Sequence, residues 1–105
     1  MTDINKGEIG QPLRVNIGED ISAATIAVII CQPEVGTTKE FTATVPATPV
    51  TLPNGDVLAA NEYAEYTTLA DTDLDYAGRW KMKLKATFSA SDIRQTNYVK
   101  FRVLN

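Results

Sequence analysis

The chain has 105 residues, which is enough for one domain with its own core and too few for two. Ten Lys and Arg residues against thirteen Asp and Glu residues leave a net charge of −3, which argues against nucleic acid as the principal partner. The single cysteine, Cys31, excludes an internal disulfide, and no apolar run is long enough to span a membrane. The first twenty residues lack the basic and apolar regions of a secretion signal, so we expect synthesis in a reducing cytoplasm.

The first third of the chain contains an arm followed by two segments with strand patterns. Residues 1–10 are polar and contain two glycines, so we expect an arm that cannot order itself by burial. Leu13, Val15 and Ile17 alternate with other residues, which predicts a strand with one buried face. Residues 23–31 are apolar on both faces, which is typical of a central strand.

Turn signals separate the next elements. Residues 33–37 (Pro-Glu-Val-Gly-Thr) predict a turn, and residues 41–45 alternate again with their odd-numbered positions apolar. Residues 46–62 form a long connection, and within it Asn54 and Gly55 are a strong hairpin signal because both tolerate positive φ. We therefore expect an extended hairpin in this connection.

Residues 79–88 show the clearest alternation in the chain, with even-numbered positions mostly apolar and odd-numbered positions polar or basic. Polar connections are expected over 71–78 and 89–95, before a last strand over 99–103. The residues that this pattern predicts to be buried are Trp80, Met82, Leu84, Val99, Phe101 and Val103. Together the chain shows about seven short antiparallel strands with frequent turns, so we expect one all-β domain over residues 1–105, a sandwich or a small barrel.

The residue types argue against catalysis. The chain has no histidine, which removes the commonest general base and the commonest transition-metal ligand, and no Gly-rich phosphate loop is present. Cys31 lies in the most apolar segment, which favours a buried structural thiol over a reactive one. We therefore predict no catalytic residue, no cofactor and no metal site.

The acidic segment Asp71-Thr72-Asp73-Leu74-Asp75 leaves one alternative open. Alternate carboxylates can bind calcium, with help from Glu62 or Glu65, although an EF-hand beginning at Asp71 is excluded. Tyr76 and Met82 stand where that motif needs Gly and Glu. The other interpretation is a solvated turn whose Asp side chains accept hydrogen bonds from nearby backbone N–H groups.

Charge is distributed unevenly along the sequence. Residues 56–75 hold six acids and no base, whereas residues 79–102 hold seven bases and one acid, Asp92. If the last two strands pair, Arg79, Lys81, Lys83 and Lys85 share a basic sheet face with Lys100 and Arg102. That face either docks an acidic partner or is a solvated surface whose long stems cover the sheet.

The segment Asp75 to Met82 resembles the corner before the sixth strand of immunoglobulin-like domains, with Trp80 in place of the corner tyrosine and Met82 in place of the cysteine. The whole chain is similar to small immunoglobulin-like structural proteins of tailed bacteriophages and prophages, including the N-terminal domains of baseplate upper proteins. The segments that carry this similarity are Lys6-Gly7-Glu8, Ile21 to Thr25, Pro33 to Gly36, Phe41 to Val45, Tyr66-Thr67-Thr68, Asp73-Leu74-Asp75, Ala77 to Trp80 and Val99 to Val103. The hairpin in residues 46–62 is an insertion relative to that pattern.

This resemblance implies an immunoglobulin-like β-sandwich of about seven antiparallel strands and a non-catalytic role in a virion, as part of the capsid, tail, baseplate or fibre. The expected partners are other virion proteins, with the chain present in many copies, and neither a membrane nor a nucleic acid is expected. The candidate docking residues are Lys6 and Gly7 in the arm and Asn54, Gly55 and Asp56 in the hairpin. An extracellular or cell-surface module that binds carbohydrate or protein is the alternative function.

Overall fold

The computed structural model describes residues 4–104, and among them it contains ten β-strands and no helix. The strands are β1 (Ile4–Asn5), β2 (Pro12–Asn16), β3 (Ile26–Pro33), β4 (Lys39–Thr42), β5 (Val50–Thr51), β6 (Val57–Leu58), β7 (Tyr63–Thr67), β8 (Gly78–Ser89), β9 (Asp92–Gln95) and β10 (Val99–Leu104). The prediction of an all-β domain is therefore confirmed for this part of the chain.

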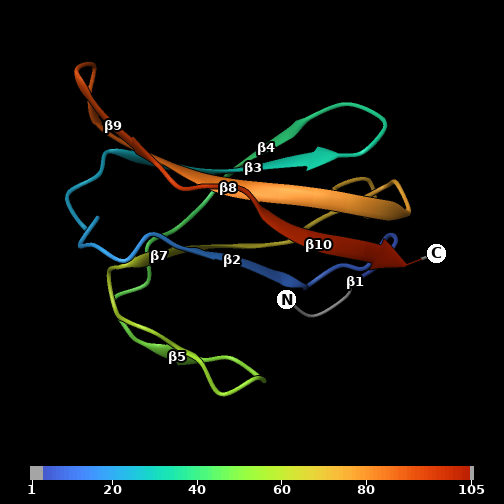
Figure 1. Cartoon of the computed structure of the whole chain (residues 1–105), viewed down its shortest axis with the longest axis horizontal. Helices are drawn as coiled ribbons and strands as arrows, with labels where there is room; N and C mark the ends of the chain where they lie inside the picture. The colour runs from blue at the N-terminus through green and yellow to red at the C-terminus, as the bar shows by residue number, and fades with distance from the viewer. Residues whose placement is uncertain (1–3, 105) are drawn as a thin grey trace.

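A six-stranded sheet forms one layer, with the order β1-β10-β8-β3-β4 and with β9 paired to the far end of β8 (Figure 1). The twelve-residue β8 reaches both neighbours, because its first half pairs with β10 and its second half with β9. All of these pairs are antiparallel except β1 with β10, which run parallel with Ile4 beside Val103. The main sheet is therefore mixed, and the expectation of antiparallel strands throughout is wrong at this edge.

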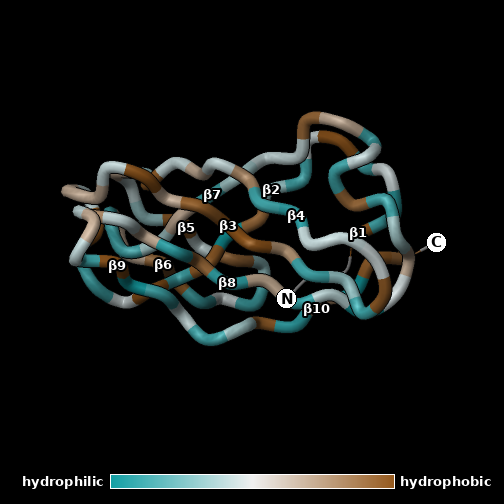
Figure 2. Tube along the Cα trace, turned by 90° about the horizontal axis from the view of Figure 1, so that it is seen from above, coloured by the Kyte–Doolittle hydropathy of each residue, from teal (hydrophilic) through white to brown (hydrophobic). Residues whose placement is uncertain are grey.

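The pair β2–β7 forms the second layer and lies across the core from the main sheet (Figure 1). After β4 the chain crosses to this layer, where Thr44 and Glu65 exchange backbone hydrogen bonds of 2.9 Å in each direction. The main sheet consequently curls toward β2–β7. Leu13 and Val15 of β2 meet Ile29 and Met82 of the main sheet in one cluster of buried residues between the layers. Figure 2 shows the long hydrophobic run of β3 within the main sheet.

Burial along β8 and β10 follows the predicted alternation with one exception. Trp80, Met82 and Leu84 are buried, as are Phe101 and Val103 of β10. Val99 is 43% exposed, so its predicted burial is wrong. It lies at the start of β10, and among residues 4–104 β1 pairs with Val103 and Leu104 at the other end of that strand.

Two connections in the sequence contain strands that periodicity did not reveal. Residues 89–95 were expected to be a polar connection, but Asp92–Gln95 forms β9 and pairs back onto β8 through a tight turn. Residues 1–10 were expected to be an arm without burial of its own, but Ile4 is only 4% exposed in β1. A short strand at a sheet edge needs only one side chain that points into the core and a neighbouring strand with unpaired backbone groups. Neither requirement produces a visible hydrophobic period in the sequence.

The turn into β8 is fixed by Trp80. Its indole N–H donates a 2.8 Å hydrogen bond to the carbonyl of Tyr76, four residues earlier, while its ring packs 6.0 Å from that of Phe101. Gly78 lies inside this corner with φ of 137°, and a Cβ there would approach the ring of Tyr76 to 3.0 Å. Gly78 is therefore required by both the backbone conformation and the close approach of the ring.

Candidate docking surfaces

The hairpin β5–β6 projects from the β2–β7 layer on the side away from the main sheet (Figure 1). Its strands pair Val50 with Leu58 and Thr51 with Val57, which confirms a hairpin in the long connection. The Asn54–Gly55 pair does not form a two-residue turn, because only Gly55 has positive φ (93°) and the loop spans residues 52–56. The tip is exposed.

The side chains of the tip hold the loop in one conformation. The backbone N–H of Asp56 donates to Asn54 Oδ1 at 3.0 Å, and Asn54 Nδ2 donates to Asp56 Oδ2 at 3.2 Å. The N–H of Leu52 donates to the carbonyl of Asp56 at 2.7 Å, which closes the loop. These contacts place Asn54, Gly55 and Asp56 together at the apex of a projecting element, as the sequence predicted.

The base of the hairpin is anchored by Tyr63, which sequence analysis did not single out. Tyr63 pairs with Asn16 in the β2–β7 ladder, whereas Ala64 and Tyr66 face the core, so Tyr63 lies on the outer face of that layer. It is nevertheless only 2% exposed, and its hydroxyl donates a 2.9 Å hydrogen bond to the carbonyl of Thr48. The long connection therefore covers this face and buries Tyr63.

Asn61 closes the same connection. It is the non-glycine residue with positive φ (63°) within residues 4–104, a conformation that Asn tolerates better than most residues. Its N–H donates to the carbonyl of Pro46 at 2.9 Å, and its carbonyl accepts from the N–H of Ile21 at 2.8 Å. These hydrogen bonds join the base of the hairpin to the rest of the domain.

Lys6 and Gly7 lie away from the hairpin, beyond the end of β1 and next to the end of β10. The N–H of Lys6 donates to the carbonyl of Leu104 at 2.6 Å, and that of Gly7 to the carbonyl of Leu74 at 3.3 Å. The side chain of Lys6 is exposed. The structure therefore does not bring the two groups of candidate docking residues together: Lys6 and Gly7 lie beside β10, and the hairpin tip lies below β2–β7 (Figure 1).

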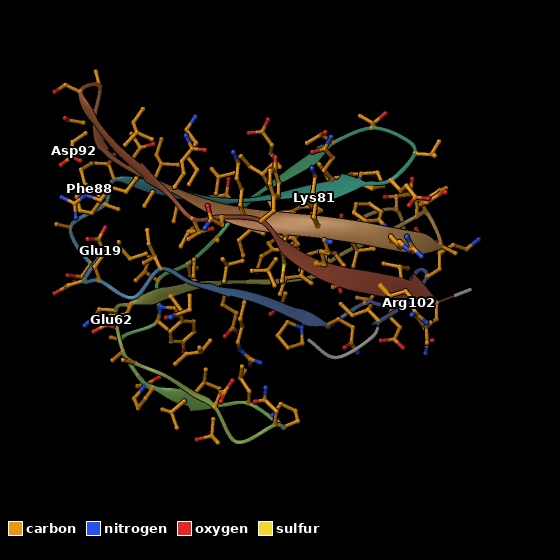
Figure 3. The ribbon with its side chains drawn as sticks, viewed as in Figure 1. Glu19, Glu62, Lys81, Phe88, Asp92 and Arg102 are labelled. Carbon is orange, nitrogen blue, oxygen red and sulfur yellow. The ribbon has the colours of Figure 1, made fainter. Side chains whose placement is uncertain are left out.

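A third surface is the outer side of the main sheet, where β8 and β10 pair, so the condition on which the sequence placed a basic face is met. Lys81 lies directly opposite Lys100, and Arg79 lies directly opposite Arg102. We define the basic face as the outward side chains Arg79, Lys81, Lys83 and Lys85 of β8 and Lys100 and Arg102 of β10. Figure 3 shows Lys81 pointing away from the β2–β7 layer. The register thus joins all six basic side chains on one side of the sheet.

A shallow groove of about 530 Å³ opens at one end of this face. Its lining includes four bases, Arg79, Lys81, Lys100 and Arg102, together with Gln32 and one acidic residue, Glu34. Tyr98, which is 40% exposed, lies against the same face, with the Nζ atoms of Lys81 and Lys83 at 4.3 Å and 5.0 Å from the centre of its ring. The basic face therefore combines positive charge with one accessible aromatic ring.

The acidic turn is organised around one carboxylate and does not gather the others. Asp73 Oδ2 accepts hydrogen bonds from the Tyr66 hydroxyl at 2.7 Å and from the N–H groups of Leu69 and Ala70 at 2.9 Å and 3.4 Å. Within the described residues, no three Asp, Glu or Cys side chains are close enough to hold a metal ion. For Asp73 the interpretation as a turn that accepts local N–H groups is confirmed.

The other acids of the calcium alternative have different neighbours. Glu65 pairs with Arg14 at 3.0 Å across the β2–β7 ladder, and Asp75 pairs with Lys39 at 3.4 Å. Burial raises the pKa of Asp73, but the N–H of Leu69, the Tyr66 hydroxyl, the N–H of Ala70 and the charge of Lys39 outweigh it and hold the pKa below its usual value. Asp73 is therefore a structural anion.

Cys31 is fully buried in β3 and lies directly opposite Met82 in the neighbouring strand. Burial, with a smaller contribution from the charge of Asp73, raises the pKa of its thiol to about 12. The two residues belong to the same sheet, so Cys31 does not face Met82 across the core as the paired cysteines of an immunoglobulin domain do.

Comparison with protein-family models, with curated proteins and with solved structures finds no match to this chain. Within residues 4–104, no helix is long and apolar enough to cross a membrane.

Proposed function

We propose that this chain is a non-catalytic docking module, a structural component of a bacteriophage or prophage virion that binds other virion proteins in many copies. The observation that carries the proposal is the projecting hairpin, whose exposed tip is closed by hydrogen bonds and whose base is held by Tyr63 and Asn61. A preformed loop on a fixed scaffold loses little entropy on binding, which suits a protein that occupies one site in an assembly. The resemblance to phage proteins supports a virion as that assembly.

We further propose that the fold is an immunoglobulin-like sandwich. The strands β3, β8 and β10 take the places of C, F and G, while β2 and β7 take those of B and E in the facing layer. The hydrogen bond from Trp80 to the Tyr76 carbonyl supports the same assignment, because the corner tyrosine of that fold makes an equivalent bond to the backbone a few residues upstream. The bridge between Thr44 and Glu65 already joins the two layers at one edge, so a crystal structure in which β2 also pairs along β1 or β10 and closes a barrel would contradict this topology.

The test of the virion role uses the native protein in the organism that encodes it. Phage particles are induced, banded on a density gradient and probed for the chain by quantitative immunoblotting and by electron microscopy with a labelled antibody. We expect a fixed number of copies per particle. Recovery of the chain in the cell envelope, with none in the particles, would support the alternative of a surface recognition module and overturn the proposal.

The role of the hairpin is tested by shortening it without unfolding it. Replacing residues 52–56 by Asn-Gly joins Thr51 directly to Val57 through a two-residue turn, the loop that such a strand pair prefers. The matched control replaces Ala90 and Ser91 by glycine in the exposed β8–β9 turn. We expect both variants to fold, and the shortened hairpin alone to reduce the copies per particle by roughly tenfold, as the loss of one interface hot spot would. Equal occupancy of both variants would show that the tip does not dock.

A further inference from the structure

We propose that the basic face binds an extended acidic segment of a partner protein, with carboxylates at every second residue contacting the cations of β8. The basic face is separate from the hairpin, so binding at this face is independent of the virion assignment. The charge and the register of β8 and β10 support such binding.

The charge of the basic face is not neutralised within the described residues. Arg14, Lys39 and Arg94 each lie within 4 Å of an acid, and Arg94 is held between Glu19 and Asp92 at one end of the molecule (Figure 3). In contrast, no ion pair among residues 4–104 involves any of the six cations of the basic face. Three of the four bases outside this face, Arg14, Lys39 and Arg94, are thus paired with acids, so the basic face differs from most of the remaining surface.

The register of β8 with β10 places like charges opposite each other. Lys81 faces Lys100 and Arg79 faces Arg102 across the antiparallel ladder, where Cβ atoms are about 4.5–5.5 Å apart. Directly opposed like charges destabilise a sheet. Solvation of the face alone does not require bases in both rows, because acids in one row would be solvated equally well and would attract the bases opposite them. A bound anion would remove the repulsion.

The spacing of the cations along β8 matches that of alternate side chains in an extended peptide. Outward residues on a strand repeat every two positions, so Arg79, Lys81, Lys83 and Lys85 form a row with a repeat of about 6.4–6.8 Å. A polypeptide in extended conformation has the same repeat between alternate side chains, because it is the same backbone. Acids at alternate positions therefore match this row one to one, and Lys100 and Arg102 form a second row beside its first half.

Two neighbours shape the surface for such a segment. The ring of Tyr98 lies within cation–π distance of Lys81 and Lys83, which restricts where their ammonium groups lie. On the other side of β8, Gln32 pairs with Lys81 and lines the groove, and Ile30 pairs with Lys83 next to it. An amide and an apolar side chain of β3 therefore border the basic face. An extended peptide could bury its aliphatic stems there.

A polypeptide fits better than a nucleic acid because the negative charge elsewhere limits the usable area. The whole chain carries −3, and Glu34 lines the groove while Glu40 lies across Ile30 from Lys83. A long polyanion would meet these acids and the acidic end with Glu19 (Figure 3). A short acidic segment contacts the basic face alone.

The test uses the intact chain and synthetic probes. The principal probe is a peptide of about ten residues in which Glu and Thr alternate, which would place its acids at the strand repeat. A second peptide has the same composition with all Glu in one block, and an oligothymidylate of equal charge is the third probe. Binding is measured by fluorescence anisotropy at about 50 mM and about 200 mM NaCl, where screening differs strongly.

The variant is Lys81→Gln with Lys100→Gln, and the control is Asn16→Asp with Thr67→Asp, two exposed positions on the β2–β7 layer that change the net charge by the same amount. We expect the alternating peptide to bind several-fold more tightly than the block peptide and to weaken with salt. The Lys variant should weaken binding by about fivefold to thirtyfold, from the loss of two exposed charge contacts, and the control should not.

The same variant should melt at an equal or higher temperature, because it removes an opposed like-charge pair. A purely structural role for these lysines predicts the reverse, a lower melting temperature with unchanged binding. No measurable binding of either peptide, equal affinity for both peptides, or tighter binding of the oligothymidylate would each overturn the proposal.

Discussion

The indole N–H of Trp80 donates a 2.8 Å hydrogen bond to the carbonyl of Tyr76, while Trp80 as a whole is only 2% exposed. One side chain therefore satisfies the backbone of the turn before β8 and fills the core behind it. A buried carbonyl without a partner would destabilise the turn.

This double role gives the first prediction. Trp80→Ala should lower the free energy of unfolding by about 3–5 kcal/mol, and Trp80→Phe by less, because Phe keeps most of the packing but loses the hydrogen bond. Urea denaturation followed by circular dichroism measures both. A loss below about 1 kcal/mol for Trp80→Ala would contradict the assignment of Trp80 to the core.

The second prediction concerns Tyr66 and Asp73. Removing either partner should destabilise the domain, and a double-mutant cycle with Tyr66→Phe and Asp73→Asn should give a coupling energy of about 1–2 kcal/mol. The pair Lys39→Gln and Asp75→Asn, whose ion pair is more exposed, provides a control with a coupling energy below about 1 kcal/mol. Additive effects of the first two substitutions would show that the 2.7 Å contact contributes nothing.

Asp73 also makes stability depend on pH. Its pKa is lower in the folded protein than in the unfolded chain, so the unfolded chain binds more protons at acidic pH. The stabilising contribution is complete above the unfolded pKa of about 3.9 and is lost as the pH falls through the folded pKa. Asp73→Asn should therefore flatten the acid limb of a stability-against-pH curve, and an unchanged limb would contradict the role of this carboxylate.

The third prediction is that Cys31 is chemically inert in the folded state. A thiol with a pKa of about 12 and no exposed surface has almost no thiolate at pH 8. A colorimetric disulfide reagent should react with the thiol only at the rate at which the domain opens, and should react at once in denaturant. Fast reaction under native conditions would mean that β3 is not protected at the centre of the sheet.

The fourth prediction separates the hairpin from the core. Tyr63→Phe should lower stability by about 1 kcal/mol, because it removes the hydrogen bond to Thr48. Tyr63→Ala should release the connection over residues 46–62 from the β2–β7 layer, seen as faster amide exchange there while β3 and β8 stay protected. Loss of protection throughout the domain would instead place Tyr63 in the main core.

Sequence periodicity predicted the elements in which packing imposes a two-residue repeat. Residues 79–88 and 99–103 lie over the core, so their alternation was visible, and Asn54-Gly55 marked the hairpin. Val99 followed the same alternation but is exposed, because periodicity records the side of the strand and not what covers it.

The features that the sequence did not reveal arise from contacts between distant segments. β1 is two residues long and is held by β10, and Tyr63 is buried on an outward face by a connection that begins before it. The basic face was predicted conditionally, since only the pairing of β8 with β10 brings Lys81 opposite Lys100. No local pattern encodes such a register.

The parallel pairing of Ile4 with Val103 has a mechanical consequence. The chain enters β1 and leaves β10 in the same direction, and the N–H of Lys6 donates to the carbonyl of Leu104 at their ends. A pulling force applied between residues 4 and 104 would slide the two strands past each other and load their hydrogen bonds in shear, all at once. Peeling breaks such bonds one at a time, so shear raises the barrier that governs forced unfolding. Tension carried through this domain would therefore be resisted first at the edge where β1 meets β10.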